Sequence, residues 1–213
     1  MKYITALKKP VLVTLALLVL CGFIYPLFLT GLAQVLFPWQ ANGSVVAADG
    51  VAVGSAIVGQ DFTDARFMRC RPSAVGYNTY TEEEKADGTY GGLASGSNNY
   101  APSNPALKER VEADIAAFLA SHPGVAKENI PTDLLTASGS GLDPHISPAS
   151  AEVQVPQLAK ETGLSEAGLR KIVAQHTEGK VLGVFGEARV NVLGVNLDIA
   201  QALGLLGSTG KAK

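Results

Sequence analysis

The chain has 213 residues and a formal net charge of −2, and hydrophobic residues make up 47% of it. No basic patch stands out, so the composition gives no reason to expect a nucleic-acid partner. Of its two cysteines, Cys21 lies in an apolar segment and Cys70 in the polar remainder, so they are not expected to reach each other for a disulfide. The cysteines therefore do not indicate whether the chain lies in an oxidising or a reducing compartment.

An apolar segment from Val11 to Leu36 contains no charged side chain. As a helix it would be about 39 Å long at about 1.5 Å per residue, enough to cross a hydrocarbon core about 30 Å thick. A cleaved signal peptide has an apolar core about half that length, and Leu20 stands before Cys21 where a lipoprotein signal needs a small residue. We therefore predict an uncleaved transmembrane helix over residues 11–36.

Basic residues precede this segment at Lys2, Lys8 and Lys9, and the next one is Arg66. The positive-inside tendency then predicts a cytoplasmic N-terminus over residues 1–10 and an extracytoplasmic position for everything after the helix. Such a chain would be anchored in a membrane, in contact with lipid. Within the span, Pro26 is expected to bend the helix, and the small residues Gly22 and Gly31 either pack against partner helices or face lipid.

After a predicted linker over residues 37–50, the sequence predicts one α+β domain over residues 51–206. Residues 51–58 are typical of a buried strand, and residues 77–102 of a long loop. A helix is predicted after Asn104, the N-cap, ending at His122.

Two further helices are predicted after the N-caps Ser147 and Ser165, with Pro156 awkwardly inside the first of them. Strands are expected over residues 181–185 and 189–195, joined by a turn. The tail, residues 207–213, is expected to be disordered. The predicted architecture is thus a single N-terminal transmembrane helix followed by an extracytoplasmic α+β domain.

Several segments resemble chemical sites. Ser138-Gly139-Ser140-Gly141 is a possible backbone nest for an anion, although a turn before a helix is the simpler interpretation. Asp143 and His145 flank Pro144, and hydrogen bonding is favoured over metal ligation because no third ligand lies nearby. Residues 155–173 have the pattern of a DNA-binding helix-turn-helix, but the expected topology and the few basic residues disfavour it. We find no catalytic constellation in the sequence.

A series of motifs occupies residues 58–60, 71–74, 95–98, 104–105, 133–134, 136–148 and 182–193. In this order they resemble the C subunit of the bacterial Kdp potassium-transporting ATPase, and the resemblance covers the chain from the apolar segment to about Leu203. The departures from the family's usual pattern are Cys70 before Arg71, Gln157 in place of Arg, and an insertion over residues 79–92. The resemblance implies a location in the inner (plasma) membrane of a bacterium.

The resemblance implies a non-catalytic accessory subunit of a high-affinity potassium import complex. Its partners would be a channel-like potassium-binding subunit, a P-type ATPase subunit phosphorylated on Asp, and a small single-span subunit. The family's C subunit is described as a catalytic chaperone that raises the ATP affinity of the ATPase subunit. No cofactor is expected to bind tightly, and ATP would bind only in a ternary complex with the ATPase subunit. Gln154 matches a glutamine proposed to contact the nucleotide.

The predicted topology conflicts with that contact, because it places Gln154 across the membrane from cytoplasmic ATP. Any effect on ATP affinity would then be an indirect coupling between distant sites, and the domain would dock over the channel-like subunit. A membrane-anchored extracytoplasmic ligand-binding or scaffold module is the alternative. The candidate residues for a partner interface are Arg71, Pro72, Ser73, Ser138, Gly139, Ser140, Gly141, Asp143, Pro144 and His145.

Overall fold

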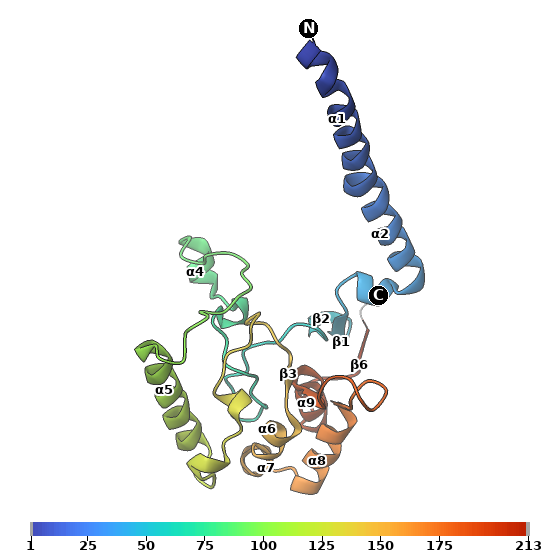
Figure 1. Ribbon diagram of the computed structural model, residues 1–213. Helices are drawn as coiled ribbons and strands as arrows, with labels where there is room; N and C mark the ends of the chain where they lie inside the picture. The colour runs from blue at the N-terminus through green and yellow to red at the C-terminus, as the bar shows by residue number, and fades with distance from the viewer. Residues whose placement is uncertain (1, 212–213) are drawn as a thin grey trace. The chain divides into compact units, whose positions relative to one another are not determined.

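A computed structural model describes the backbone of residues 2–211 and the side chains from Leu7 onward. The chain divides into two compact units, with the boundary between Val45 and Val46. The first unit is helical, and the second is an α/β domain with small sheets (Figure 1).

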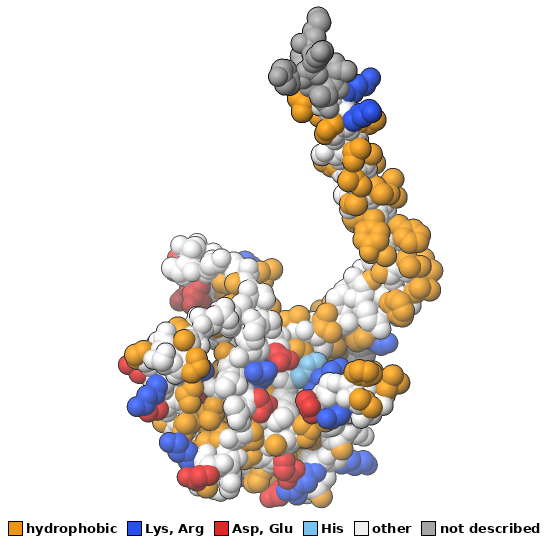
Figure 2. Space-filling model, in the orientation of Figure 1, with side chains coloured by type: hydrophobic (Ala, Val, Ile, Leu, Met, Phe, Trp, Pro, Cys, Tyr) orange, Lys and Arg blue, Asp and Glu red, His pale blue; other side chains and the backbone are white. Residues whose placement is uncertain are grey.

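The first unit contains the helices α1 (Lys2–Val19) and α2 (Tyr25–Leu36), joined by a single π-helical turn, Leu20–Ile24. Residues Leu7–Leu36 have a mean hydropathy of 2.5 and qualify by length and composition as a membrane span. Figure 2 shows hydrophobic side chains along this helix. Pro26 is the second residue of α2, just after the π-helical turn, as expected for a residue that removes one backbone donor and disturbs the helical hydrogen bonds around it.

Residues 37–50, predicted to form a linker, contain regular structure. They include a short helix, α3 (Pro38–Ala41), and a strand, β1 (Val45–Ala48). β1 continues into β2 (Val51–Ser55) through Asp49-Gly50, which have φ values of +50° and +82°. Two adjacent left-handed residues are what a tight type I′ hairpin requires, and Asp-Gly is its common sequence signal.

The predicted disorder of residues 207–213 is wrong for residues 209–211. Thr209–Lys211 form β6, which pairs antiparallel with β1 in a sheet of order β2-β1-β6. The Asp49 carboxylate adds a side-chain contact by accepting a hydrogen bond from the Gly207 N–H at 2.9 Å. The polar tail is therefore ordered by backbone pairing with a strand that lies far away in the sequence.

A second sheet has the order β3-β5-β4, formed by His145–Ile146, Arg189–Asn191 and Thr177–Glu178. The predicted strand over residues 189–195 is correct only as far as Asn191, where helix α9 (Val192–Ala202) begins. The Asn191 side chain accepts a hydrogen bond from the Gly194 N–H and caps that helix. Residues 181–185 form a tight loop with one bridge, Val181 to Phe185, and not a strand.

The helices α6 (Pro148–Glu152), α7 (Val155–Thr162) and α8 (Glu166–Gln175) gather with α9 around the main core (Figure 1). The N-caps predicted at Ser147 and Ser165 are confirmed. Pro156 lies in the first turn of α7, where its missing N–H has no helical partner to lose. The buried core residues here are Met68, Ile146, Ala151, Val155, Leu158, Leu169, Val190, Val192, Val195 and Ile199.

Helix α5 (Pro105–Ser121) lies at another side of the domain and carries the predicted cap at Asn104. Phe118 of α5 packs with Ile130 and Leu134 in a second, smaller core. Ile130 follows the 3₁₀ turn Lys127–Asn129, and Leu134 ends the 3₁₀ turn Thr132–Leu134. The predicted loop over residues 77–102 is mostly irregular. It also contains the end of a 3₁₀ turn (Gly76–Asn78) and a short helix, α4 (Glu82–Ala86), which begins with a Thr81/Glu84 capping box.

Residues 59–75 form no helix or strand, yet Met68 within them is fully buried. Two buried side-chain amides satisfy the backbone there. Asn196 of α9 accepts from the Met68 N–H at 2.7 Å and donates to its carbonyl at 2.9 Å. Gln154 does the same for Arg69, at 2.8 and 3.3 Å. These amides replace the neighbouring strand that an extended segment would otherwise need in the interior.

Candidate functional site

The fold brings together the two motif segments singled out in the sequence, residues 71–73 and 138–145. Arg71 Nη1 lies 3.2 Å from Asp143 Oδ2, and Ser73 Oγ donates to the carbonyl of Gly141 at 2.6 Å. Pro72 lies between these contacts along the chain. Since both links join residues about 70 positions apart, the two segments form one surface of the domain.

Asp143 is held in place mainly by His145. The His145 N–H donates to Asp143 Oδ1 at 3.0 Å, and the His145 ring lies 3.5 Å from the same oxygen. These hydrogen bonds and the Arg71 guanidinium hold the pKa of the Asp143 carboxyl below its usual value, although burial opposes them. Asp143 is therefore an ionised carboxylate at neutral pH, with its side chain 29% exposed.

Between Asp143 and His145, Pro144 is buried, and its carbonyl accepts the first N–H of α9, from Val192, at 3.0 Å. This bond ties the candidate surface to the main core. Among the residues that the structure describes, no cluster of three or more His, Cys, Asp or Glu side chains has metal-binding geometry.

The serine-glycine segment forms a turn in which the hydroxyl oxygens of the two serines accept hydrogen bonds from nearby backbone N–H groups. Ser138 Oγ accepts from the Gly141 N–H at 2.8 Å, and Ser140 Oγ accepts from the Leu142 N–H at 3.1 Å. Gly141 has φ +68°, and a Cβ there would lie 2.8 Å from the carbonyl oxygen of Gly96. The segment thus holds neighbouring loops together, while Gly139 and Ser140 stay exposed.

Gln154 lies apart from this surface, at the start of α7, and is 1% exposed. Besides its two bonds to Arg69, its Nε2 donates to the Ser150 carbonyl at 3.0 Å. Each polar atom of the side chain therefore has a protein partner, and a nucleotide would have to displace those bonds to reach it.

Two hollows border Arg71. One, of about 530 Å³, also contains Asp143, His145, Glu187 and Arg189. We call it the Asp143 groove. Glu187 and Arg189 were not predicted as site residues, although both lie in the matching motif over residues 182–193.

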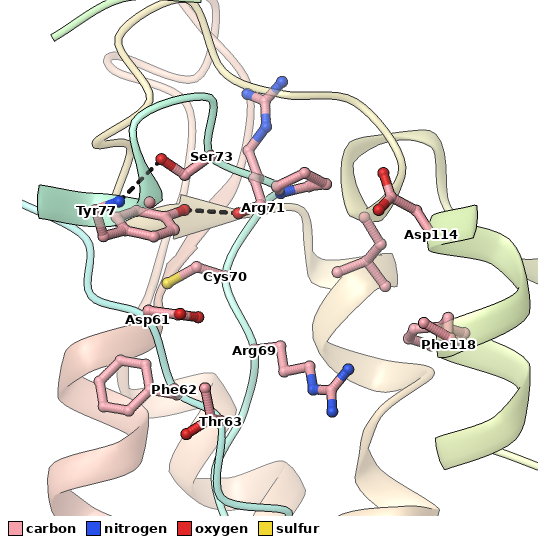
Figure 3. A pocket seen from close by; sticks show the side chains of 14 residues that line it. Asp61, Phe62, Thr63, Arg69, Cys70, Arg71, Ser73, Tyr77, Asp114 and Phe118 are labelled. Carbon is pink, nitrogen blue, oxygen red and sulfur yellow. Dashed lines mark hydrogen bonds between the residues drawn. The ribbon is translucent and has the colours of Figure 1, made fainter. Parts of the chain in front are cut away.

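The other hollow, of about 370 Å³, is shown in Figure 3. Arg69, Cys70 and Arg71 follow one another along its wall, and Asp114 and Phe118 face them from α5. The Tyr77 hydroxyl donates to the Arg71 carbonyl at 2.7 Å, and burial raises the pKa of the Cys70 thiol to about 12. Cys70 is therefore a protonated, unreactive side chain at neutral pH.

The membrane candidates Gly22, Pro26 and Gly31 all lie in the first unit, Gly22 in the π-helical turn and the other two in α2. A Cβ at either glycine would meet nothing within 4 Å. Their packing against other helices stays a prediction.

Comparison with known proteins gives a consistent result. The family model described as "KdpC: K+-transporting ATPase, c chain" matches residues 7–201. The protein named potassium-transporting ATPase KdpC subunit in Clostridium kluyveri is 63% identical over 95% of this chain and 97% of its own length. Proteins of the same name in Clostridioides difficile and Sorangium cellulosum are 56% and 50% identical, over 94% and 91% of this chain and 99% and 97% of their own lengths. The chain therefore belongs to the family of the c chain of K⁺-transporting ATPases.

Proposed function

We propose that this chain is a non-catalytic accessory subunit of an ATP-driven potassium import complex in the bacterial inner membrane. The observation that carries the proposal is the extent of the family match, which includes the apolar helix and the downstream domain together. The helix would anchor the chain with its N-terminus in the cytoplasm. The domain would then meet the channel-like, P-type ATPase and small single-span subunits from the outer face.

The Asp143 groove is the surface we assign to a partner subunit. The side chains of Arg71 and Asp143 remain 25% and 29% exposed while paired with each other. Each can therefore also contact a side chain of a partner subunit. Their positions are fixed by Ser73, Gly141 and Pro144, whose bonds reach the neighbouring loops and α9. A fixed, partly desolvated charge pair favours one partner orientation over others.

Any influence on ATP affinity is proposed to be indirect. In this topology the domain and the nucleotide lie on opposite sides of the bilayer, and Gln154 is enclosed by Arg69 and Ser150. The domain would bind one conformation of the complex more tightly than the others and so stabilise it. If that conformation also binds ATP more tightly, the ATP affinity rises by the coupling free energy between the two sites.

Co-purification in mild detergent tests the assembly proposal. A tagged wild-type chain at native expression is expected to recover the other pump chains. Asp143→Asn keeps an acceptor for His145 but removes the charge facing Arg71, so recovery should fall about fivefold or more. Asp64→Asn is the matched control, because Asp64 forms a surface ion pair with Arg66 at 2.6 Å. A wild-type chain that runs alone would instead support the independent ligand-binding or scaffold module.

Labelling with an impermeant thiol reagent tests the topology. Glu83 is exposed in α4, so Glu83→Cys in a chain lacking Cys21 and Cys70 should be labelled on intact spheroplasts. Lys8→Cys in the same background should be labelled only after lysis. The opposite pattern would place the domain in the cytoplasm and make a direct contact with ATP possible again.

A further inference from the structure

The loop between β4 and β5 carries a concentrated apolar surface. Val181, Leu182, Val184 and Phe185 are 59%, 86%, 73% and 65% exposed. In Figure 1 this loop projects from the domain, and Figure 2 shows hydrophobic side chains gathered there. Single exposed apolar residues are common on monomeric proteins and need no explanation. A contiguous group of exposed apolar side chains, in contrast, is typical of an interaction site. We call residues 181–185 the apolar tip.

The apolar tip is held in a defined shape by its own backbone. Val181 and Phe185 exchange hydrogen bonds of 2.8 and 3.0 Å between their N–H and carbonyl groups, and the Gly183 N–H donates to the Lys180 carbonyl at 3.0 Å. Leu182 has φ +54°, a conformation that Gly or Asn adopts with less strain. The turn therefore presents a large apolar side chain where a small or polar one would fit its backbone better.

The charges below the apolar tip argue against a lipid surface as the occupant. Lys180 pairs with Glu187 at 3.2 Å, and Arg189 pairs with Glu178 at 2.6 Å. The two basic and two acidic side chains leave no net charge there, whereas attraction to anionic headgroups depends on an excess of Lys and Arg.

The apolar tip is too small to form a stable interface with any protein by itself. Four side chains on one loop offer a few hundred Å², well below the about 800 Å² per partner of a stable interface. The tip is thus suited to be an anchor inside a larger contact. That larger contact is available in the Asp143 groove, because Glu187 and Arg189 at the base of the loop also line the groove.

We infer that the apolar tip inserts into an apolar concavity on another integral subunit of the same potassium pump, beside the contact made by the Asp143 groove. This inference rests on the proposed function and names a second part of the same docking face. Leu182 and Phe185 are the anchors, and the ion pairs at the base form the polar rim that surrounds such anchors in protein interfaces.

A double variant of the full-length chain, Leu182→Asn with Phe185→Ser, tests the inference in the assembled complex. Asn tolerates positive φ, so the turn should keep its shape while losing its apolar surface. Recovery of the other pump chains by the tagged variant should fall about tenfold, while its melting temperature stays unchanged. Leu93→Asn is the matched control, since Leu93 is 87% exposed and belongs to the segment between α4 and α5. Recovery by this variant should stay within about twofold of the wild type.

Photo-crosslinking identifies the occupant. A benzophenone amino acid at position 182, in native membranes, should form a covalent product with another chain of the pump. Products with lipid only, with a second copy only, with a protein outside the pump, or with nothing would overturn the inference, as would wild-type recovery by the double variant. Failure of the wild-type chain to recover any pump chain is a different result, which refutes the proposed function itself.

Discussion

Replacing Gln154 with leucine separates a structural role from a nucleotide-binding role. Leucine is similar in size but neither accepts nor donates hydrogen bonds. The change would leave the Arg69 N–H without its 2.8 Å acceptor and remove a donor from the carbonyls of Arg69 and Ser150.

The expected loss of stability follows from these bonds. A buried donor or acceptor left unpaired costs about 1–3 kcal/mol. The carbonyls keep a second lone pair and leucine gains apolar burial, so the Arg69 N–H dominates and the net loss should be about 2–4 kcal/mol. For a domain of this size, each kcal/mol lowers the melting temperature by about 2–4 °C, which gives a decrease of about 5–15 °C.

The assay is thermal unfolding of the full-length chain in detergent, followed by near-UV circular dichroism. Gln157→Leu on the same helix is the matched control, because Gln157 bonds only Glu161 at the surface and its loss should stay within about 0.5 kcal/mol. In complexes assembled well below the melting temperature, the apparent KM for ATP should be equal for wild type and Gln154→Leu. An unchanged melting temperature together with a raised KM would refute the structural role and favour direct nucleotide contact.

Two further changes test other parts of the domain. Gly141→Ala should destabilise the domain by more than about 1 kcal/mol in urea unfolding, because the new Cβ would contact the Gly96 carbonyl and φ at this position is +68°. Gly139→Ala is the control, since a Cβ there would meet nothing within 4 Å. Equal losses of stability in the two variants would contradict this explanation. Burial raises the pKa of Asp133, but hydrogen bonds from Ser147 and Ser150 outweigh it and keep the folded-state pKa below the usual value. The stability from these bonds is therefore present above about pH 4 and lost as pH falls through the lower folded-state pKa. The unfolding free energies of wild type and Asp133→Asn should accordingly differ at pH 7 and converge on acidification. A difference that stays constant with pH would show that Asp133 acts without its charge.

Local signals in the sequence predicted the elements whose causes are local. The caps at Asn104, Ser147 and Ser165 appear in the structure because a short polar side chain satisfies the free N–H groups of the first helical turn. Asp49-Gly50 and the Thr81/Glu84 pair are local signals of the same kind, typical of a tight hairpin and of a helix N-terminus, and they coincide with the first hairpin and with α4.

Helix α9 shows where periodicity fails. Its residues include Val192, Val195 and Ile199, which favour strands when considered singly. Seven of its eleven residues are buried, including Leu197 and Asn196, so the polar stripe that identifies a surface helix is missing. β6 fails for the opposite reason, because Thr209–Lys211 have no apolar pattern and become a strand only through pairing with β1.

Gln154 shows why a residue matched to a family's proposed site needs the fold before it acquires a role. A glutamine side chain is chemically able to hydrogen-bond a nucleotide, and the sequence around Gln154 does not distinguish that use from another. The structure shows a second amide, Asn196, making the same pair of bonds to the adjacent residue of one irregular segment. Since Gln154 and Asn196 come from different helices and bind Arg69 and Met68 in succession, their shared geometry is explained by the backbone they pair with. The irregular segment needs two buried amides because its backbone N–H and carbonyl groups have no neighbouring strand to pair with. Arg69, in that segment, is 85 residues away from Gln154 in the sequence, so the residues around Gln154 do not reveal this role.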